Sequence, residues 1–126
     1  MMEVELMPKR IQLSRARGWR LPEGAVNVAR PSRWGNPYRV ADFGLDLALE
    51  LFENTVHGIW TPVPVKCLDD YRSGRANEAH HAFLRRWGHL SPIVEAQDKL
   101  RGLDVACWCR LDARCHGDLW LLWANQ

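Results

Sequence analysis

The pattern of apolar and polar side chains along the chain predicts three short strands. Residues 10–14 alternate between apolar and polar side chains, which is the period of a half-buried strand. Residues 25–29 and 103–107 are short, apolar and partly β-branched, so we expect both to be strands and the second to be buried. Segments rich in proline, glycine or arginine follow the first two strands, and we expect these segments to be loops.

Four other stretches carry the spacing of a helix. The first has Asp42 placed as an N-cap, and apolar side chains recur every three or four residues behind it. A later one begins at Pro92, because proline suits the first helical position, and it stops before Gly102. The predicted helices span residues 41–56, 77–87, 92–101 and 118–125.

The elements come in the order strand, strand, three helices, strand, helix, which predicts a small α/β (or α+β) fold. The chain has 126 residues, 47% of them hydrophobic, enough for one core. We therefore expect a single domain over residues 9–126, with a short sheet of about three strands packed by about four helices. Residues 1–8 are expected to be a disordered leader.

Composition also bounds the cellular setting. There is no apolar run of about twenty residues and no signal peptide, so we expect a cytoplasmic protein without a membrane partner. In that compartment the four cysteines are more often thiols, metal ligands or catalytic groups than disulfides.

Charge is unevenly distributed along the chain. Residues 1–40 carry eight basic and three acidic side chains, a net charge of +5, while the whole chain carries +2. An arginine-rich segment favours phosphate or nucleic acid as a partner, because a guanidinium group can bind two phosphate oxygens at once. A solvated basic edge without a partner is the other interpretation.

The loop 30–37 (Arg-Pro-Ser-Arg-Trp-Gly-Asn-Pro) is the first candidate for a binding site. Its two prolines restrict the backbone and its Gly-Asn pair can adopt a positive φ, so we expect a tightly turned, fixed loop at the end of a strand. Rigid loops in this position often carry ligand-binding side chains. The alternative is a structural corner in which Trp34 fills the core. The candidate ligand-binding residues are Arg30, Arg33, Trp34, Gly35 and Asn36.

The turn 107–118, between the last strand and the last helix, is the second candidate. Three of the four cysteines and one histidine lie in it, which are the ligand types of a tetrahedral zinc site. The spacing C-x-C-x5-C-H differs from the usual C-x2-C knuckle, so zinc is one interpretation among three. Its candidate metal ligands are Cys107, Cys109, Cys115 and His116.

The other two interpretations of this turn need no metal. Cys115 lies at the N-terminus of the predicted helix, beside His116, where the helix dipole and an imidazolium favour a reactive thiolate. Asp118 would then cap the helix or orient the imidazole, and Cys115, His116 and Asp118 are the candidate catalytic residues. Alternatively, the first two cysteines fill the core as small hydrophobic side chains and His116 caps the helix.

The two motifs together resemble a known family. Arg-Pro-x-x-Trp-Gly-Asn-Pro at residues 30–37 and Ala-Cys-Trp-Cys…Cys-His-x-Asp at residues 106–118 are similar to motifs of a small domain family of bacteriophages and actinobacteria. The resemblance covers both ends of the chain, whereas residues 40–90 are not distinctive. That family is a domain of unknown function, so the resemblance implies no reaction and no cofactor.

In a parallel sheet both loops follow the carboxyl ends of their strands, where ligands usually bind. We therefore expect one pocket, formed by the loop 30–37 and the turn 107–118, that binds a phosphate-bearing nucleotide or nucleic-acid base and, as an enzyme, processes it. The arginines would hold phosphate, Trp34 would stack on the base, and His116 with Asp118 would supply acid–base chemistry. Two alternatives stay open: a non-catalytic nucleic-acid-binding module with a structural zinc or packed thiols at the turn, and a phage protein that binds a host protein.

Overall fold

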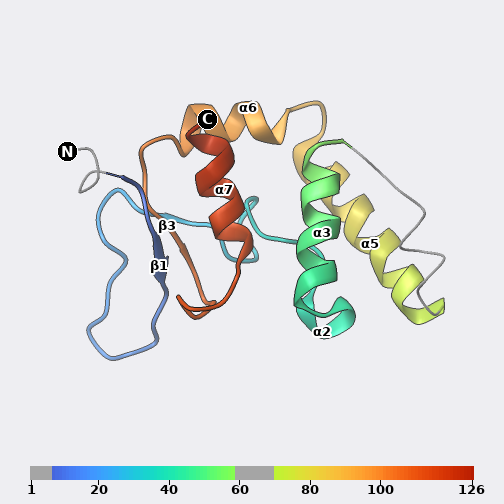
Figure 1. Ribbon diagram of the computed structural model, residues 1–126, viewed down its shortest axis with the longest axis horizontal. Helices are drawn as coiled ribbons and strands as arrows, with labels where there is room; N and C mark the ends of the chain where they lie inside the picture. The colour runs from blue at the N-terminus through green and yellow to red at the C-terminus, as the bar shows by residue number, and fades with distance from the viewer. Residues whose placement is uncertain (1–6, 59–69) are drawn as a thin grey trace. The chain divides into compact units, whose positions relative to one another are not determined.

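The computed structural model describes residues 7–58 and 70–126 of the chain (Figure 1). These residues form two compact units, one made of residues 7–35 with 93–126 and the other of the described residues between 36 and 92. Most of the expected leader, and most of the connection between the first two predicted helices (41–56 and 77–87), lie outside the described residues.

The first unit contains a parallel sheet of three short strands. They are β1 (Arg10–Gln12), β2 (Val26–Asn27) and β3 (Val105–Cys107), in the order β1-β3-β2. All three residues of β3 are buried, as expected for a central strand with an apolar sequence. Because both pairings are parallel, the segments after the three strands all begin at the same edge of the sheet, which we call the carboxyl edge.

Helix α7 (His116–Ala124) follows β3 and packs against β3 and β1 (Figure 1). Its tryptophans are buried: Trp120 is 0% exposed and Trp123 is 3% exposed. The indole Nε1 of Trp120 donates a hydrogen bond of 2.7 Å to the carbonyl oxygen of Trp34, in the loop after β2. Helix α6 (Pro92–Lys99) precedes β3 and begins at proline as predicted. The sheet, α7 and the loop after β2 therefore share one core.

The second unit consists of helices: α2 (Val40–Phe43), α3 (Leu45–Val56) and α5 (Asp70–Trp87). The Tyr38 hydroxyl is buried and lies 2.7 Å from the hydroxyl of Thr55 in α3. The Tyr38 ring also contacts Phe43 edge-on, with ring centroids 6.0 Å apart.

The mixed α/β class, the three strands and the start of α6 are confirmed, but the prediction of one helix over residues 41–56 is wrong. Gly44 has φ 81° and ψ 162°, a conformation that ends α2 and begins α3. Asp42 is therefore not an N-cap but lies inside α2, where it forms an ion pair of 3.4 Å with Arg75. The apolar period continues across Gly44, so periodicity alone did not reveal the break.

Two other helix boundaries also differ from prediction. Helix α5 begins at Asp70 and so is longer than the predicted 77–87, and it contains Gly74. Helix α7 begins at His116 rather than 118, with Cys115 as N-cap. Within the described parts of the chain, no helix combines the length and apolar character needed to cross a membrane.

Candidate metal centre

Three thiols meet at the carboxyl edge of the sheet. The Sγ atoms of Cys107, Cys109 and Cys115 all lie within 4.8 Å of one another, and Cys107 Sγ lies 3.8 Å from Cys109 Sγ. All three are free thiols, because a disulfide would need about 2.05 Å between sulfurs. Cys107 and Cys115 are buried and Cys109 is partly exposed. This cluster, which we call the thiol triad, is thus reachable from one side.

The local structure explains how the triad is assembled. Cys107 is the last residue of β3, and in an extended backbone Cys109 returns to the same face two residues later. The intervening Trp108 points away and is 44% exposed. Cys115 then joins from the other end of the turn as the N-cap of α7, where its Sγ accepts the Gly117 N–H at 3.4 Å.

His116 lies beside the triad with its two ring nitrogens in different surroundings. The Nε2 atom is 2.7 Å from the carbonyl oxygen of Val28, and Nδ1 is 3.6 Å from Cys115 Sγ. Since a carbonyl only accepts hydrogen bonds, Nε2 carries the proton, and in the neutral ring Nδ1 keeps a lone pair directed at the sulfur. Burial lowers the pKa of His116, which favours this neutral ring. The carbonyl at the end of β2 therefore orients an unprotonated nitrogen toward the triad.

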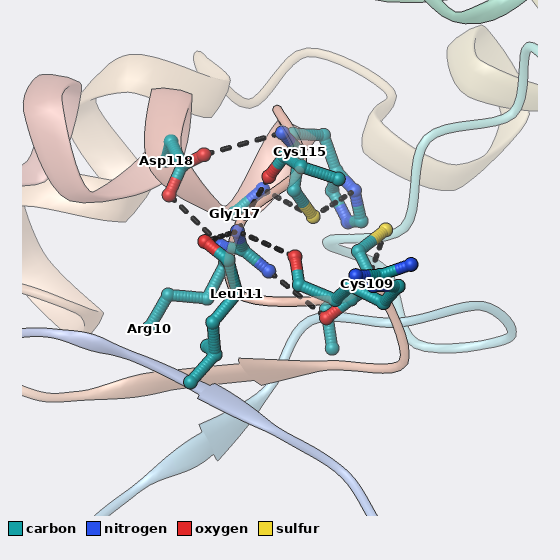
Figure 2. A network of polar contacts seen from close by, with 10 residues as sticks. Arg10, Cys109, Leu111, Cys115, Gly117 and Asp118 are labelled. Atoms are coloured by element: carbon teal, nitrogen blue, oxygen red, sulfur yellow. Dashed lines mark hydrogen bonds and ion pairs between the residues drawn. The ribbon is translucent and has the colours of Figure 1, made fainter.

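Arg10, from β1, holds the turn from inside (Figure 2). Its side chain is 5% exposed, and its Nε donates to Asp118 Oδ1 at 2.9 Å. The other guanidinium nitrogens donate to the main chain of the turn: Nη1 to Cys109 O at 3.1 Å, and Nη2 to Arg110 O at 3.1 Å, Leu111 O at 3.4 Å and Ala113 O at 2.7 Å. One buried cation thus gathers four carbonyls of the segment that connects Cys109 with Cys115.

Gly117 makes room for this guanidinium. A Cβ atom at residue 117 would lie 2.9 Å from Arg10 Cδ, closer than real Cβ contacts. The Asp118 carboxylate completes the arrangement, because its Oδ2 accepts the Cys115 N–H at 3.2 Å and closes a capping box. The sequence Cys-His-Gly-Asp is therefore accounted for residue by residue at the start of α7.

The protonation of the triad follows from its crowding. Side-chain hydrogen bonds with Cys109 and Cys115 lower the pKa of Cys107 well below its ordinary value. The pKa of Cys109 and that of Cys115 are both raised, first because of the hydrogen bond that each shares with Cys107. Burial alone would lower the pKa of Arg10, but its hydrogen bond to Asp118 and the cysteine charges outweigh burial and raise it. Ionisation of Cys107 is thus favoured over ionisation of the other two thiols.

The loop after β2 also begins at this edge, as expected, but Trp34 does not face a ligand there. Trp34 is 6% exposed, the Trp120 ring meets it edge-on at 4.9 Å, and the Arg33 guanidinium lies 4.7 Å over its ring. Arg33 also pairs with Glu95 at 2.9 Å. Arg30 is exposed, and Gly35 lies so close to it that a Cβ would be 2.9 Å from Arg30 Cγ.

Asn36, the last of the predicted ligand-binding residues, belongs to the second unit. Its Nδ2 donates to Ala48 O at 3.2 Å and its Oδ1 accepts the Tyr38 N–H at 2.8 Å. It is 8% exposed. These contacts give it a structural role in the turn that leads to α2.

Asp118 does not orient His116. Its two oxygens bond to Arg10 and to the Cys115 main chain, while the ring nitrogens of His116 face Val28 and Cys115. The three predicted catalytic residues are neighbours, but they form a helix cap and a thiol cluster rather than an acid–base relay. A hollow of about 330 Å³ lies at the opposite, amino-terminal edge of the sheet, lined in part by Lys9, Glu23 and Asp104.

Sequence reasoning missed Arg10 and the Val28 carbonyl. Arg10 is the first residue of an alternating strand, and its position directly beside β3 in the sheet is what aims it at the turn. The sequence carried one signal of a close contact at this place, the glycine at position 117, directly after the Cys-His pair. Glycine has a low helix propensity, so its presence near the start of a helix indicates that a larger side chain does not fit there.

A family model matches residues 11–126, which includes the triad, His116 and the whole loop after β2. The chain belongs to the DUF4326 family. DUF4326 is described as a domain of unknown function, which agrees with the family type expected from the two motifs. No match was found among the curated proteins or among the solved structures.

Proposed function

We propose that this DUF4326 protein is a zinc-binding module in which Cys107, Cys109, Cys115 and His116 hold one ion. Three sulfurs within 4.8 Å of one another carry the proposal. A zinc–sulfur bond of about 2.3 Å in a tetrahedral site places its sulfurs about 3.8 Å apart, which matches the Cys107–Cys109 separation of 3.8 Å.

The geometry of His116 supports its assignment as the fourth ligand. With about 2.1 Å for a zinc–nitrogen bond and about 2.3 Å for zinc–sulfur, the sulfur and nitrogen ligands lie about 3.6 Å apart. Cys115 Sγ and His116 Nδ1 are 3.6 Å apart. A ligating histidine almost always donates its other N–H to a carbonyl or carboxylate. The Val28 carbonyl supplies that acceptor.

The charges also suit zinc. A divalent ion with three thiolates and a neutral imidazole has a net charge of −1, and the buried Arg10 cation offsets it. The Gly117 N–H adds a hydrogen bond to the Cys115 sulfur. With four protein ligands the ion would have no open position for substrate, so the proposed role is structural: it fixes the turn 107–118.

The ligand class that we propose for this edge is a phosphate-bearing nucleotide or nucleic acid, bound without chemistry. The three segments after the strands (13–25, 28–35 and 108–115) contain seven arginines and two acids, a net charge of +5. Guanidinium groups bind phosphate in a bidentate manner. Arg30 is one of the exposed members of this set, and the proposal assigns it a phosphate contact.

Metal analysis tests the zinc site. The full chain, expressed with zinc and freed of loose metal by gel filtration, is expected to contain about one equivalent by mass spectrometry. In the Co²⁺-substituted protein we expect the intense sulfur-to-metal band of a tetrahedral thiolate site. Cys115→Ala should lose the ion, whereas Cys67→Ala, at the one cysteine outside the turn, should retain it.

A measurement on the wild-type protein tests the metal site independently of whether the variants fold. Chelation should lower the thermal midpoint, because an ion at a thousand times its Kd stabilises the folded state by about 4 kcal/mol. Metal-free wild-type protein after zinc expression, or an unchanged cobalt spectrum in Cys115→Ala, would refute the site.

A further inference from the structure

The loop that follows β1 is an arginine-rich arm that begins at the carboxyl edge. This basic arm, residues 14–24, is the loop drawn between β1 and the next strand in Figure 1. It carries Arg15, Arg17 and Arg20, whose side chains are all exposed. None of the three forms an ion pair with any residue that the structure describes. Three exposed guanidinium groups are therefore available for phosphate oxygens.

Trp108 links this arm to the metal turn. The Arg15 guanidinium carbon lies 4.6 Å from the centre of the Trp108 ring, a cation–π contact. Trp108 is 44% exposed, whereas Trp34, Trp120 and Trp123 are 6% exposed or less. An indole that large is usually buried unless it has a partner to stack on. Its position between Cys107 and Cys109 means that the proposed ion would fix its backbone on both sides.

The arm carries three arginines and one acid, Glu23, which lies at the opposite edge of the sheet. The opposite edge of the sheet presents the mixed set Lys9, Glu23 and Asp104 around its hollow. At the carboxyl edge, ion pairs with acids occupy Arg33 and Arg110. The exposed arginines of the arm lie outside these pairs, and one of them, Arg15, lies over an aromatic ring.

We propose that the basic arm and Trp108 form a binding surface for single-stranded nucleic acid, in which the arginines contact successive phosphates and one base stacks on the indole. Arginine and an exposed aromatic ring side by side are the elements of sequence-tolerant single-strand binding. A duplex keeps its bases stacked on each other, so Trp108 would find no face to contact. The inference rests on the proposed function for its ligand class and for the metal that fixes Trp108.

Fluorescence anisotropy with labelled oligonucleotides tests the surface. A fluorescein-labelled single strand of fifteen thymidines should bind more tightly than a duplex of the same length. Trp108→Ala should weaken single-strand binding about 5- to 150-fold, which corresponds to one lost base stack, and Trp108→Phe should restore much of it. The matched control for loss of an exposed apolar side chain is Leu122→Ala on α7, which is 57% exposed.

The phosphate contacts of the arm are tested by measuring how the affinity for the single strand depends on salt concentration. Changing Arg15, Arg17 and Arg20 to glutamine should reduce the slope of log Kd against log salt concentration by about 2, because each phosphate contact on a single strand contributes about 0.7. The control changes the exposed Arg85 and Arg86, in the last turn of α5, to glutamine and should leave the slope nearly unchanged.

Zinc content is measured on the same samples, so the two proposals fail separately. Zinc-loaded protein that does not bind the single strand, or binds the duplex equally well, would overturn the nucleic-acid surface and leave the metal site intact. Tight single-strand binding by protein that holds no zinc would support the surface and overturn the metal site. An unchanged affinity in Trp108→Ala would overturn the stacking contact, and an unchanged salt slope in the arm variant would overturn the phosphate contacts.

Discussion

The contacts of Arg10 give a sharp prediction about what holds the turn together. Arg10→Ala removes an ion pair with Asp118 and hydrogen bonds to four carbonyls of the turn. The arginine side chain is 5% exposed, but its ionic partner Asp118 is 50% exposed, so Arg10→Ala leaves no buried charge behind. What is lost is the hydrogen bonding of a charged group, which is typically worth about 1.5 to 3 kcal/mol. We expect the free energy of unfolding of Arg10→Ala to fall by an amount in that range.

The companion change Asp118→Asn separates the ion pair from the carbonyl contacts. The Asp118 side chain is 50% exposed, and ion pairs that water can reach are typically worth about 0 to 1 kcal/mol. Asparagine can still accept the Cys115 N–H and maintain the cap. We therefore expect Asp118→Asn to cost about 1 kcal/mol and to leave most of the Arg10 contribution in place.

Urea unfolding at pH 7, followed by circular dichroism with zinc held at saturation, gives both values. Arg101→Ala is the matched control, because Arg101 also donates to two carbonyls, Ala124 O at 3.0 Å and Gln126 O at 2.8 Å, but is exposed. It should cost less than about 1 kcal/mol. A cost for Arg10→Ala no larger than that of Arg101→Ala, or equal costs for Arg10→Ala and Asp118→Asn, would contradict the account of a buried carbonyl clamp.

Two further predictions concern single positions. Gly117→Ala should lower the free energy of unfolding in urea by about 1 to 3 kcal/mol, because the new Cβ would lie 2.9 Å from Arg10 Cδ. The control Gly74→Ala, inside α5, meets nothing within 4 Å and should raise the free energy of unfolding by about 0.5 to 1 kcal/mol. Equal effects of the two changes would contradict the close approach at Gly117. Tyr38→Phe should cost about 1 to 2 kcal/mol, because it leaves the buried Thr55 hydroxyl without its 2.7 Å partner. Burial raises the pKa of Tyr38 above that of the unfolded chain, so the neutral phenol stabilises the fold below about pH 10 and this contribution is lost as pH rises through the raised pKa. Unfolding titrations from pH 8 to 12 should show a steeper alkaline loss in the wild type than in Tyr38→Phe, and parallel curves would refute the burial effect.

The sequence predicted the sheet because its strands have simple patterns. The short, partly β-branched apolar run at residues 103–107 indicated a buried strand, and β3 is indeed central, with all three residues buried. The break at Gly44 was hidden, because the apolar spacing on the two sides of it stays in phase although the backbone does not. Local pattern thus found the elements but not the discontinuity between α2 and α3.

The site was predicted in part for a related reason. The grouping of Cys107, Cys109 and Cys115 is a local property of one turn, so spacing could suggest it. The clamp from Arg10 depends on a strand pairing between residues far apart in the sequence, which no short pattern records. Trp34 illustrates the opposite case: its motif is distinctive, but the reason is packing against Trp120 rather than contact with a ligand.

The pairing of β1 with β3 also has a consequence for biosynthesis. The contacts of Arg10 with the turn join residues 99 to 108 positions apart, and among the described residues β3 is the sole neighbour of β1 in the sheet. At about 5 to 20 residues per second, the ribosome needs roughly 5 to 20 s to make the intervening chain. During that time the first strand and its arginine lack the strand with which they pair. Assembly of this unit therefore waits for the last strand, and chaperones that shield nascent segments have a defined interval in which to act.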